Sequence, residues 1–395
     1  MKRSSQHSDE QNACPLKKTS IGGQALIEGI MMRGPKKSAM AVRNPSDEIV
    51  FEEWENATNH RPSITKLPII RGAFNFVDSM VTGYKALMRS AELSGLEEAE
   101  AEAERETVIK KAKKEAAKKN KKAGLPPPST EELEKATEEA LRAYEEKKAK
   151  DGKGSSSLLT TVIMMLSAVL GVGISLLLFI YLPSFLFSLL TKIFPQLADP
   201  SAPIRSSFVK SFFEGALKVL IIVGYMALVS LMKDIRRTFQ YHGAEHKTIF
   251  CYEHGFELTV ENVRKERRFH PRCGTSFLIL MVLVGMLVSF FIDPIALLTV
   301  GYVPSNLIRT LIRVLLLPII MGLGYEVLKI AGKHDNLFTR IVSAPGLWLQ
   351  RITVLEPDDK MIECAIRAFV AVIPENEKPA EEAPAKEENE SNSEQ

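Results

Sequence analysis

The residues best suited to chemistry are concentrated in one segment, residues 240–256, which reads QYHGAEHKTIFCYEHGF. His242 and His246 stand four residues apart, so on a helix both imidazoles project from one face, one turn apart. Glu245 falls within the same arc. This H-x-x-E-H order is the inverted zinc-peptidase motif, in which two histidines bind the metal and the glutamate acts as general base. The segment predicts a divalent metal site, with zinc as the expected ion and Glu245 as the catalytic base.

The same spacing also fits two polar histidines that merely lie at a membrane interface. The distribution of the remaining histidines favours a metal, because most of them lie in segments that we expect to be cytoplasmic and next to apolar runs. Five of the seven histidines belong to this set: His242, His246, His254, His270 and His334.

A third metal ligand must come from elsewhere in the chain. Glu326, about eighty residues downstream, fits the inverted motif, which normally employs a downstream acidic ligand. Cys273 is the rival, because thiolate suits zinc and the adjacent Arg272 favours its ionisation, although it also fits a thiol buried at the start of a membrane helix. His270 is open as well, and so is Glu253, which returns to the histidine face if the helix continues that far.

Four long apolar runs between positions 158 and 333 set the architecture that must hold this site. The chain has 395 residues, 45% hydrophobic and 25% charged, but the two kinds are segregated, which excludes an ordinary soluble protein. The first run has no charged residue for about 25 positions, more than the roughly 20 that a membrane crossing requires. We therefore expect a mainly α, polytopic membrane bundle of about four transmembrane helices. The runs cover 158–182, 212–232, 276–292 and 307–330.

Basic residues indicate how these spans are oriented. Lys and Arg gather before the first run and again in the segment 233–274, between the second and third runs. The positive-inside rule then places the N-terminus, this segment and the C-terminus in the cytoplasm, with the predicted metal site at the cytoplasmic membrane face. Arg309 and Arg313, inside the fourth run, are discordant with a simple span.

Composition narrows the remaining function classes. Four cysteines without tight spacing do not form a disulfide framework and fit a reducing compartment. The N-terminus lacks the apolar core of a cleaved signal peptide. A net charge of +3 does not suggest nucleic acid, and the glycines of GGQALIEGIMMRG do not form a nucleotide-binding loop. We expect those glycines to allow close backbone packing, with Glu28 and Arg33 as charges that could face a site.

The flanking regions divide into an N-terminal unit, 21–91, and a charged helical insertion, 92–153, made of two helices around GLPPP. In the N-terminal unit we expect a β-hairpin over 38–54 and an amphipathic helix from Ile70. The helix carries an apolar stripe for which core packing is the expectation and a membrane-surface location the alternative. The stripe consists of Phe74, Val77, Val81, Tyr84 and Met88.

The C-terminal part of the chain continues the membrane region, which we place at 154–373. We expect a helix that begins after Asp358 and presents one apolar face to the core, and an interfacial anchor at Trp348. Residues 1–20 and the acidic segment 374–395 have the composition of disordered tails.

Several of these segments together resemble one family. GGQALIEGIMMRGP, YHGAEHKTI, LTVENVR, PRCGTSF, GYEVLK, PGLWLQ and EPDD occur in this order across residues 20–373. The chain thus resembles the YqhQ-like family of bacterial integral membrane proteins, a set of unknown function described as predicted metal-dependent enzymes. The resemblance implies a multi-span protein of the bacterial inner membrane with a bound metal.

Two hypotheses follow. In the first, the protein is a zinc-type hydrolase at the cytoplasmic membrane face, with a peptide, amide or lipid as substrate. In the second, the protein is a non-catalytic transporter subunit or assembly factor, and a closed metal site only holds the cytoplasmic segment against the helix bundle. The number of protein ligands distinguishes them, because catalytic zinc keeps one open position and structural zinc usually has four protein ligands.

Overall fold

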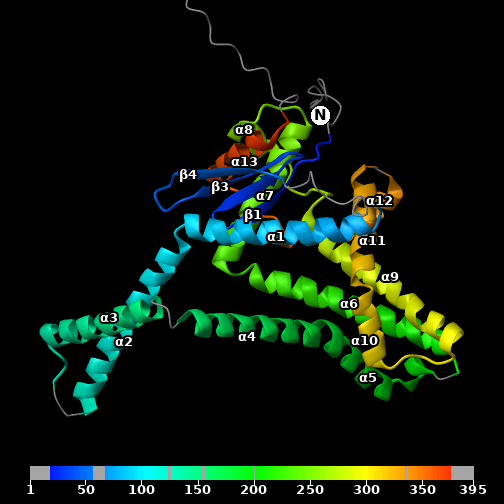
Figure 1. The fold of residues 1–395 in the computed structure, drawn as a ribbon, viewed down its shortest axis with the longest axis horizontal. Coiled ribbons are helices and arrows are strands. Elements are labelled where there is room, and N and C mark those ends of the chain that lie inside the picture. The colour runs from blue at the N-terminus through cyan, green and yellow to red at the C-terminus, as the bar shows by residue number, and fades with distance from the viewer. Residues whose placement is uncertain are drawn as a thin grey trace, which may run out of the picture.

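The computed structural model describes residues 18–56, 67–122, 126–152, 156–199, 201–333 and 336–374. Long helices form most of this part of the chain, and one small antiparallel sheet lies at one end of it (Figure 1). The expected fold class, a mainly α membrane bundle with a small N-terminal β portion, is confirmed. His334 and both terminal tails, apart from their innermost residues, lie outside the described residues.

The sheet has four strands in the order β1-β2-β3-β4. The expected hairpin is present as β3 and β4, with Ala41 opposite Phe51. The glycine-rich motif, for which we expected only close packing, forms a second hairpin with a tight turn in which Glu28 has a φ of 49°. The strands are β1 (Gly22–Leu26), β2 (Gly29–Arg33), β3 (Lys37–Arg43) and β4 (Ile49–Glu55).

Helices cover both faces of this sheet. Successive side chains of a strand point to opposite faces, so consecutive apolar residues give the sheet an apolar surface on each side. Ile30 and Met32 pack into a core with α7 (Lys233–Glu253) and α13 (Asp359–Val372). Met31, between them, points to the other face and joins a smaller cluster under α1 (Ile70–Leu93). The expected C-terminal helix is therefore present, and its apolar face is core. Asp358 caps its first turn by accepting from the Met361 N–H.

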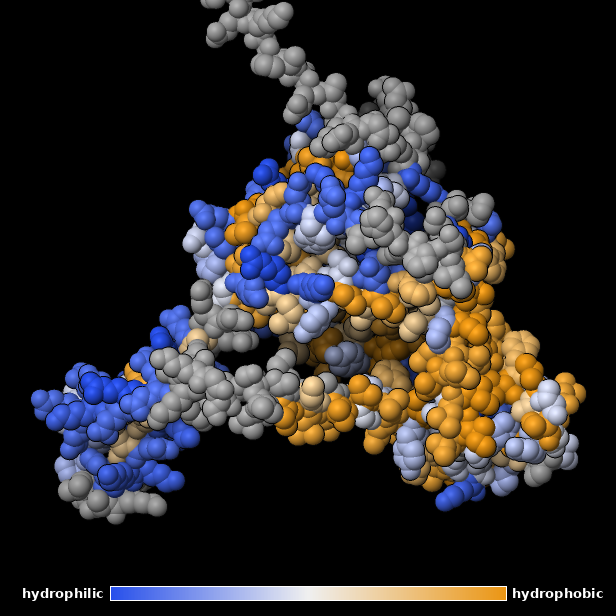
Figure 2. All heavy atoms as spheres, viewed as in Figure 1, coloured by the Kyte–Doolittle hydropathy of each residue, from blue (hydrophilic) through white to orange (hydrophobic). Residues whose placement is uncertain are grey.

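Among the described residues, three helices are long and apolar enough to cross a membrane, and a fourth crossing results if a bent pair counts as one. The bend of 52° lies between α10 and α11, in the run that carries the discordant arginines. Beneath the sheet, apolar residues dominate the surface of the membrane-helix region (Figure 2). The helices of this whole region, whether or not they belong to a candidate span, are α4 (Ser156–Leu176), α5 (Leu182–Ile193), α6 (Pro203–Val229), α9 (Gly274–Val300), α10 (Asn306–Leu315), α11 (Leu317–Lys333) and α12 (Leu337–Thr353).

The two discordant arginines are accounted for by partners inside the bundle. Arg313 lies 2.8 Å from a carboxylate oxygen of Glu214 on α6, and Arg309 pairs with Asp293 on α9. Such pairing is how charged side chains are tolerated at membrane depth. Neither arginine therefore argues against the bent pair as a membrane element.

The amphipathic helix forms as expected, but its environment differs from the main expectation. All five side chains of the apolar stripe on α1 are exposed, so the prediction that they pack into the core is wrong. The buried positions of α1 are Gly72, Gly83, Ala86 and Ser90 instead. Beyond α1, the charged insertion forms two helices, α2 (Leu96–Lys122) and α3 (Thr130–Gly152), which pack on each other and project away from the sheet (Figure 1).

Candidate metal centre

Helix α7 carries the H-x-x-E-H motif through the middle of the molecule. Its residues from Gly243 to Cys251 are buried between strand β1, helix α13 and the chain that follows α12. Gly243 lets that chain pass close by, since a Cβ at this position would collide with the Leu355 carbonyl oxygen. The motif helix is thus fixed on several sides, and its histidine side chains have little freedom to move.

His242, His246 and Cys273 converge in space. One possible ligand atom from each residue lies within 4.8 Å of the other two, and His242 Nε2 is 3.1 Å from Cys273 Sγ. Ligand atoms of one tetrahedral zinc ion stand about 3.5 Å apart, which lies within this range. Cys273 is the N-cap residue of α9, and its sulfur accepts a hydrogen bond from the Thr275 N–H. The structure therefore brings the two motif histidines together with one of the proposed third ligands.

Backbone carbonyls fix the orientation of both imidazoles. His242 Nδ1 is 3.0 Å from the Thr353 carbonyl oxygen, and His246 Nδ1 is 2.5 Å from that of Arg268. Because a carbonyl oxygen only accepts, each Nδ1 must carry the proton and donate it. Each Nε2 is then the nitrogen whose lone pair can bind a metal when no proton occupies it, the arrangement in which metal-binding histidines are commonly held.

A metal fits the donor set that results. His246 Nε2 is buried and has no hydrogen-bond partner, and such an orphaned acceptor is costly unless something unseen satisfies it. Two imidazole nitrogens and a sulfur are the donor types that zinc prefers. Burial alone would raise the pKa of the Cys273 thiol, but His242 and His246 hold that pKa well below its usual value. The sulfur is therefore readily available as the thiolate that binds metal.

Cys273 has the reciprocal effect on its neighbour. Burial disfavours the charged form of His242 most strongly, yet the charge and hydrogen bond of the Cys273 sulfur raise the pKa of His242 to about 9. Without a metal, the two groups thus share a proton as an imidazolium–thiolate pair. A metal cation would replace this proton, because it binds the neutral imidazole and the thiolate.

Glu245, the expected catalytic base, is buried next to His242, His246 and Cys273, and its carboxylate accepts a hydrogen bond from the backbone of Gly23. Burial raises the pKa of its carboxyl group, although both motif histidines and the backbone N–H of Gly23, which donates to it, act in the opposite direction. Gly23 is also the reason the side chain fits, since a Cβ there would come within 2.8 Å of Glu245 Cγ and Cδ. The GGQAL segment thus contributes a positioning residue that sequence reasoning missed, although its glycines suggested close packing.

A pocket of about 560 Å³ adjoins the group and gives it access to solvent. Glu245, His246 and Cys273 form part of its wall. Helix α11 contributes another part of the wall, including Tyr325 and Leu328. Basic side chains also line the pocket: Lys18, Arg272 and Lys329. Two of the three converging residues, His246 and Cys273, are therefore reachable from this pocket together with Glu245.

Glu326 does not lie in this group. Its carboxylate binds the Arg71 guanidinium through two hydrogen bonds of 2.6 and 2.5 Å, which ties α11 to the first turn of α1. Of the two candidates for the third ligand, the structure therefore brings Cys273 to the motif histidines and pairs Glu326 with a cationic partner instead.

The other two alternatives, Glu253 and His270, lie beside the group. Glu253 pairs with Arg272 and accepts from the Thr19 N–H, and its carboxylate is 3.7 Å from the His270 ring. The His270 ring lies 5.6 Å from that of His246. They form a polar cluster that holds the loop before α9 rather than part of the ligand set. Glu28 and Arg33 also point elsewhere, toward Arg237 and Asp78 respectively.

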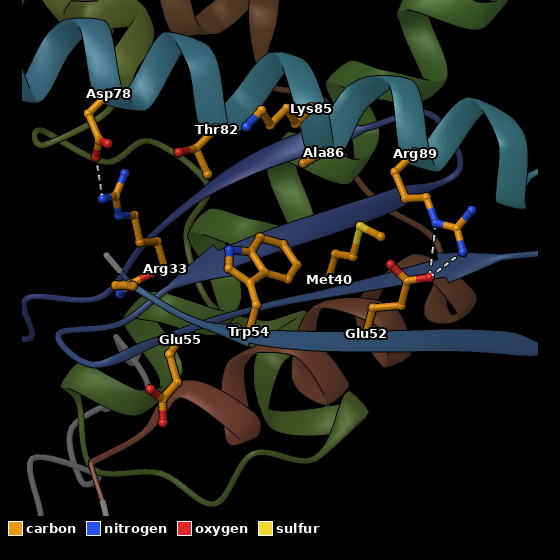
Figure 3. A pocket seen from close by; sticks show the side chains of 11 residues that line it. Arg33, Met40, Glu52, Trp54, Glu55, Asp78, Thr82, Lys85, Ala86 and Arg89 are labelled. Atoms are coloured by element: carbon orange, nitrogen blue, oxygen red, sulfur yellow. Dashed lines mark hydrogen bonds and ion pairs between the residues drawn. The ribbon is translucent and has the colours of Figure 1, made fainter. Parts of the chain in front are cut away.

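A second pocket, of about 360 Å³, lies between α1 and the sheet (Figure 3). Its strongest charges are already paired across it. Arg33 binds Asp78, and Arg89 binds Glu52 at 2.7 Å. It contains neither cysteine nor histidine, so its chemistry is weaker than that of the group around His246.

Comparisons with known proteins agree on one family. Residues 67–375 match a family described as "Protein of unknown function (DUF1385)". The chain is 32% identical to "Uncharacterized protein YqhQ" of Bacillus subtilis (strain 168) over 371 residues, which cover 91% of this chain and 96% of that protein. No solved structure matches the chain.

Proposed function

The chain belongs to the family of unknown function described as DUF1385, and from its site we propose that it is a metal-dependent hydrolase. In this proposal the protein acts at the cytoplasmic face of the bacterial inner membrane. His242, His246 and Cys273 hold a divalent ion, with zinc the expected one, and Glu245 is the general base.

The observation that carries the proposal is the convergence of two imidazoles and a thiol on one point, with His246 Nε2 buried and unpartnered. Thr353 and Arg268 support it, because their carbonyls select the tautomer in which both Nε2 atoms can bind an ion. When bound, such an ion would lower the pKa of a water molecule toward about 7 and polarise the bond to be cleaved.

Glu245 fits the role of base because its pKa is raised by burial and it lies within the pocket wall. A carboxylate whose pKa lies closer to neutrality takes up a proton more readily than an ordinary glutamate. The Gly23 N–H holds one side of the carboxylate, so the group is oriented before a substrate arrives. Proton transfer at the Glu245 carboxylate is thus the step that we assign to this residue.

The wall formed by α11 indicates how a substrate would approach. Tyr325 and Leu328 belong to a helix that forms part of a candidate membrane span, so the pocket can receive the polar end of a membrane-associated molecule. Peptide, amide and lipid substrates all fit this description. The basic residues of the segment 233–274 support a cytoplasmic location of the pocket, because Lys and Arg are enriched on the cytoplasmic side of membrane proteins.

The alternative, a structural metal site in a transporter subunit or assembly factor, has less support. Structural zinc sites usually have four protein ligands. Within the described part of the chain the group contains three residues that could hold a metal, and a pocket borders two of them, His246 and Cys273. This arrangement leaves a position for water, as in a catalytic site.

The experiment is a hydrolysis screen of the full-length protein in lipid nanodiscs with added Zn²⁺. Peptide, amide and ester reporter substrates with lipid tails are compared between wild type and the Glu245→Gln variant. We expect at least one reporter to be cleaved, and cleavage to fall by about 100- to 10,000-fold in the variant while its metal content is unchanged. Equal cleavage by wild type and variant would contradict the role of Glu245.

A further inference from the structure

The apolar stripe of α1 faces away from every element that packs on this helix. Six large apolar side chains form it once Met80 is included, and each is between 47% and 61% exposed. They recur along about four turns of one face, which is the pattern of a helix that buries one side. They are Phe74, Val77, Met80, Val81, Tyr84 and Met88.

The opposite side of α1 makes the contacts. Gly72 lies against α11, since a Cβ there would come within 2.9 Å of Gly322 Cα. Near the other end, Gly83 contacts Gln24 of β1, whose amide donates to the Gly83 carbonyl. Polar side chains of α1, including Asp78 and Arg89, point toward the sheet (Figure 3). The helix is therefore amphipathic with its polar side on the sheet and its apolar side uncovered.

Helix α1 begins at the level where α11 changes from apolar to charged. The contact at Gly322 is followed one turn later by Glu326, which binds Arg71 of α1. The candidate span that contains α11 ends at Ala331, and all three charged residues of this helix lie near that end: Glu326, Lys329 and Lys333. This change marks the boundary between hydrocarbon and headgroups, so α1 starts at that boundary.

The fold also places α1 across the junction of the two parts of the molecule. The sheet lies on one side of it and the membrane helices on the other (Figure 1). Because the polar side faces the sheet, the stripe is directed away from the sheet and toward the level of the membrane helices. Its exposed apolar surface is thus on the side of α1 where the candidate membrane helices lie.

The size of the stripe argues against a second copy of the chain as the partner. The six side chains expose on the order of 600 Å², whereas a stable protein interface buries about 800 Å² per partner. A bilayer surface requires no such minimum area or complementary shape, since burial of apolar side chains among acyl chains is favourable in itself.

We propose that α1 is an interfacial helix whose Phe74–Met88 stripe is buried in the cytoplasmic leaflet of the membrane. Its occupant is lipid, and its role is to hold the sheet at a fixed height above the bundle. The Arg71–Glu326 pair and the Gly72–Gly322 contact join α1 to α11 and thereby set this height.

The test uses the full-length protein in nanodiscs that contain phospholipids with brominated acyl chains, which quench tryptophan fluorescence only where the indole meets the hydrocarbon. Val81→Trp places the reporter on the stripe. Ser79→Trp is the matched control, an exposed position on the opposite side of the same helix. Leu220→Trp, an exposed position on α6, reports a lipid-facing site within a span. The unsubstituted protein gives the background of its two native tryptophans.

We expect the added fluorescence of Val81→Trp to be largely lost in brominated nanodiscs, as for Leu220→Trp, and that of Ser79→Trp to be retained. Two results would overturn the proposal. In the first, Val81→Trp is quenched by aqueous iodide and not by brominated lipid, which places the stripe in water. In the second, it is protected from both quenchers and Cys residues introduced at Val81 cross-link two chains, which assigns the stripe to a second copy.

Discussion

Replacing Gly23 with alanine would disturb the base without touching the metal ligands. The new Cβ would lie 2.8 Å from Glu245 Cγ and Cδ and 2.8 Å from Met32 Sδ, whereas ordinary contacts begin at 3.4 Å. The separation must therefore grow by roughly 0.6 Å, the difference between these two distances, in a packed site. Such overpacking costs about 1 to 3 kcal/mol, so we expect the Gly23→Ala variant to unfold several degrees below wild type.

Gly22→Ala is the matched control. It adds the same methyl group one residue earlier in the same strand, but no atom lies within 4 Å of the position its Cβ would take. Both variants are measured in nanodiscs by thermal unfolding, metal content and cleavage of whichever reporter substrate wild type hydrolyses. We expect both to retain metal, and only Gly23→Ala to lose stability and about 100-fold in activity, the cost of displacing a catalytic group by about 1 Å.

A double variant tests whether the stability lost in Gly23→Ala comes from the contact with Glu245. In a Glu245→Ala background the carboxylate that the new methyl group meets is absent, so Gly23→Ala should cost less stability there than in wild type. Equal stability of the Gly22→Ala and Gly23→Ala variants in the wild-type background would refute the packing of Glu245 on Gly23.

Three further predictions concern the surroundings of the site. In metal-free protein the ultraviolet absorbance of a thiolate should be present well below pH 9 and disappear in Cys273→Ser, because nearby histidines lower the pKa of this thiol; an identical titration of both proteins would contradict this. Glu326→Gln should retain full metal content, since its carboxylate binds Arg71 rather than the histidines; loss of metal would return Glu326 to the ligand set. Cysteines introduced near residue 264 should be protected from a membrane-impermeant reagent in intact cells, and those near residue 199 labelled; the reverse pattern would place the site outside.

Regular periodicity made part of this architecture predictable. The stripe on α1, the spacing of His242 and His246 on α7 and the capped start of α13 each depend on residues a few positions apart, which is the range over which helices impose a pattern. The membrane spans were predictable for the same reason, from length and apolar composition.

The features that sequence reasoning missed or left open depend on contacts between distant segments. Cys273 and Glu326 were equally acceptable chemically. Only the contact of the α9 N-cap with His242 of α7, and the packing of α1 on α11, decide between them. Strand β1 was not recognised because glycines occupy its first two positions, and β2 was not recognised because its buried residues form a continuous run instead of alternating with exposed ones. Burial of the α1 stripe in a protein core was the wrong expectation, because periodicity reveals an apolar face but not what covers it.

The most direct test of the proposed function is the metal content of the purified full-length protein after metal-replete expression. Wild type is compared with His242→Ala, His246→Ala and Cys273→Ser by elemental analysis, with Glu245→Gln as the matched control that alters the same helix without removing a ligand. We expect about one zinc ion per chain in wild type and Glu245→Gln, and little or none in the histidine variants. Absence of metal from wild type, or full retention in both histidine variants, would contradict the metal centre.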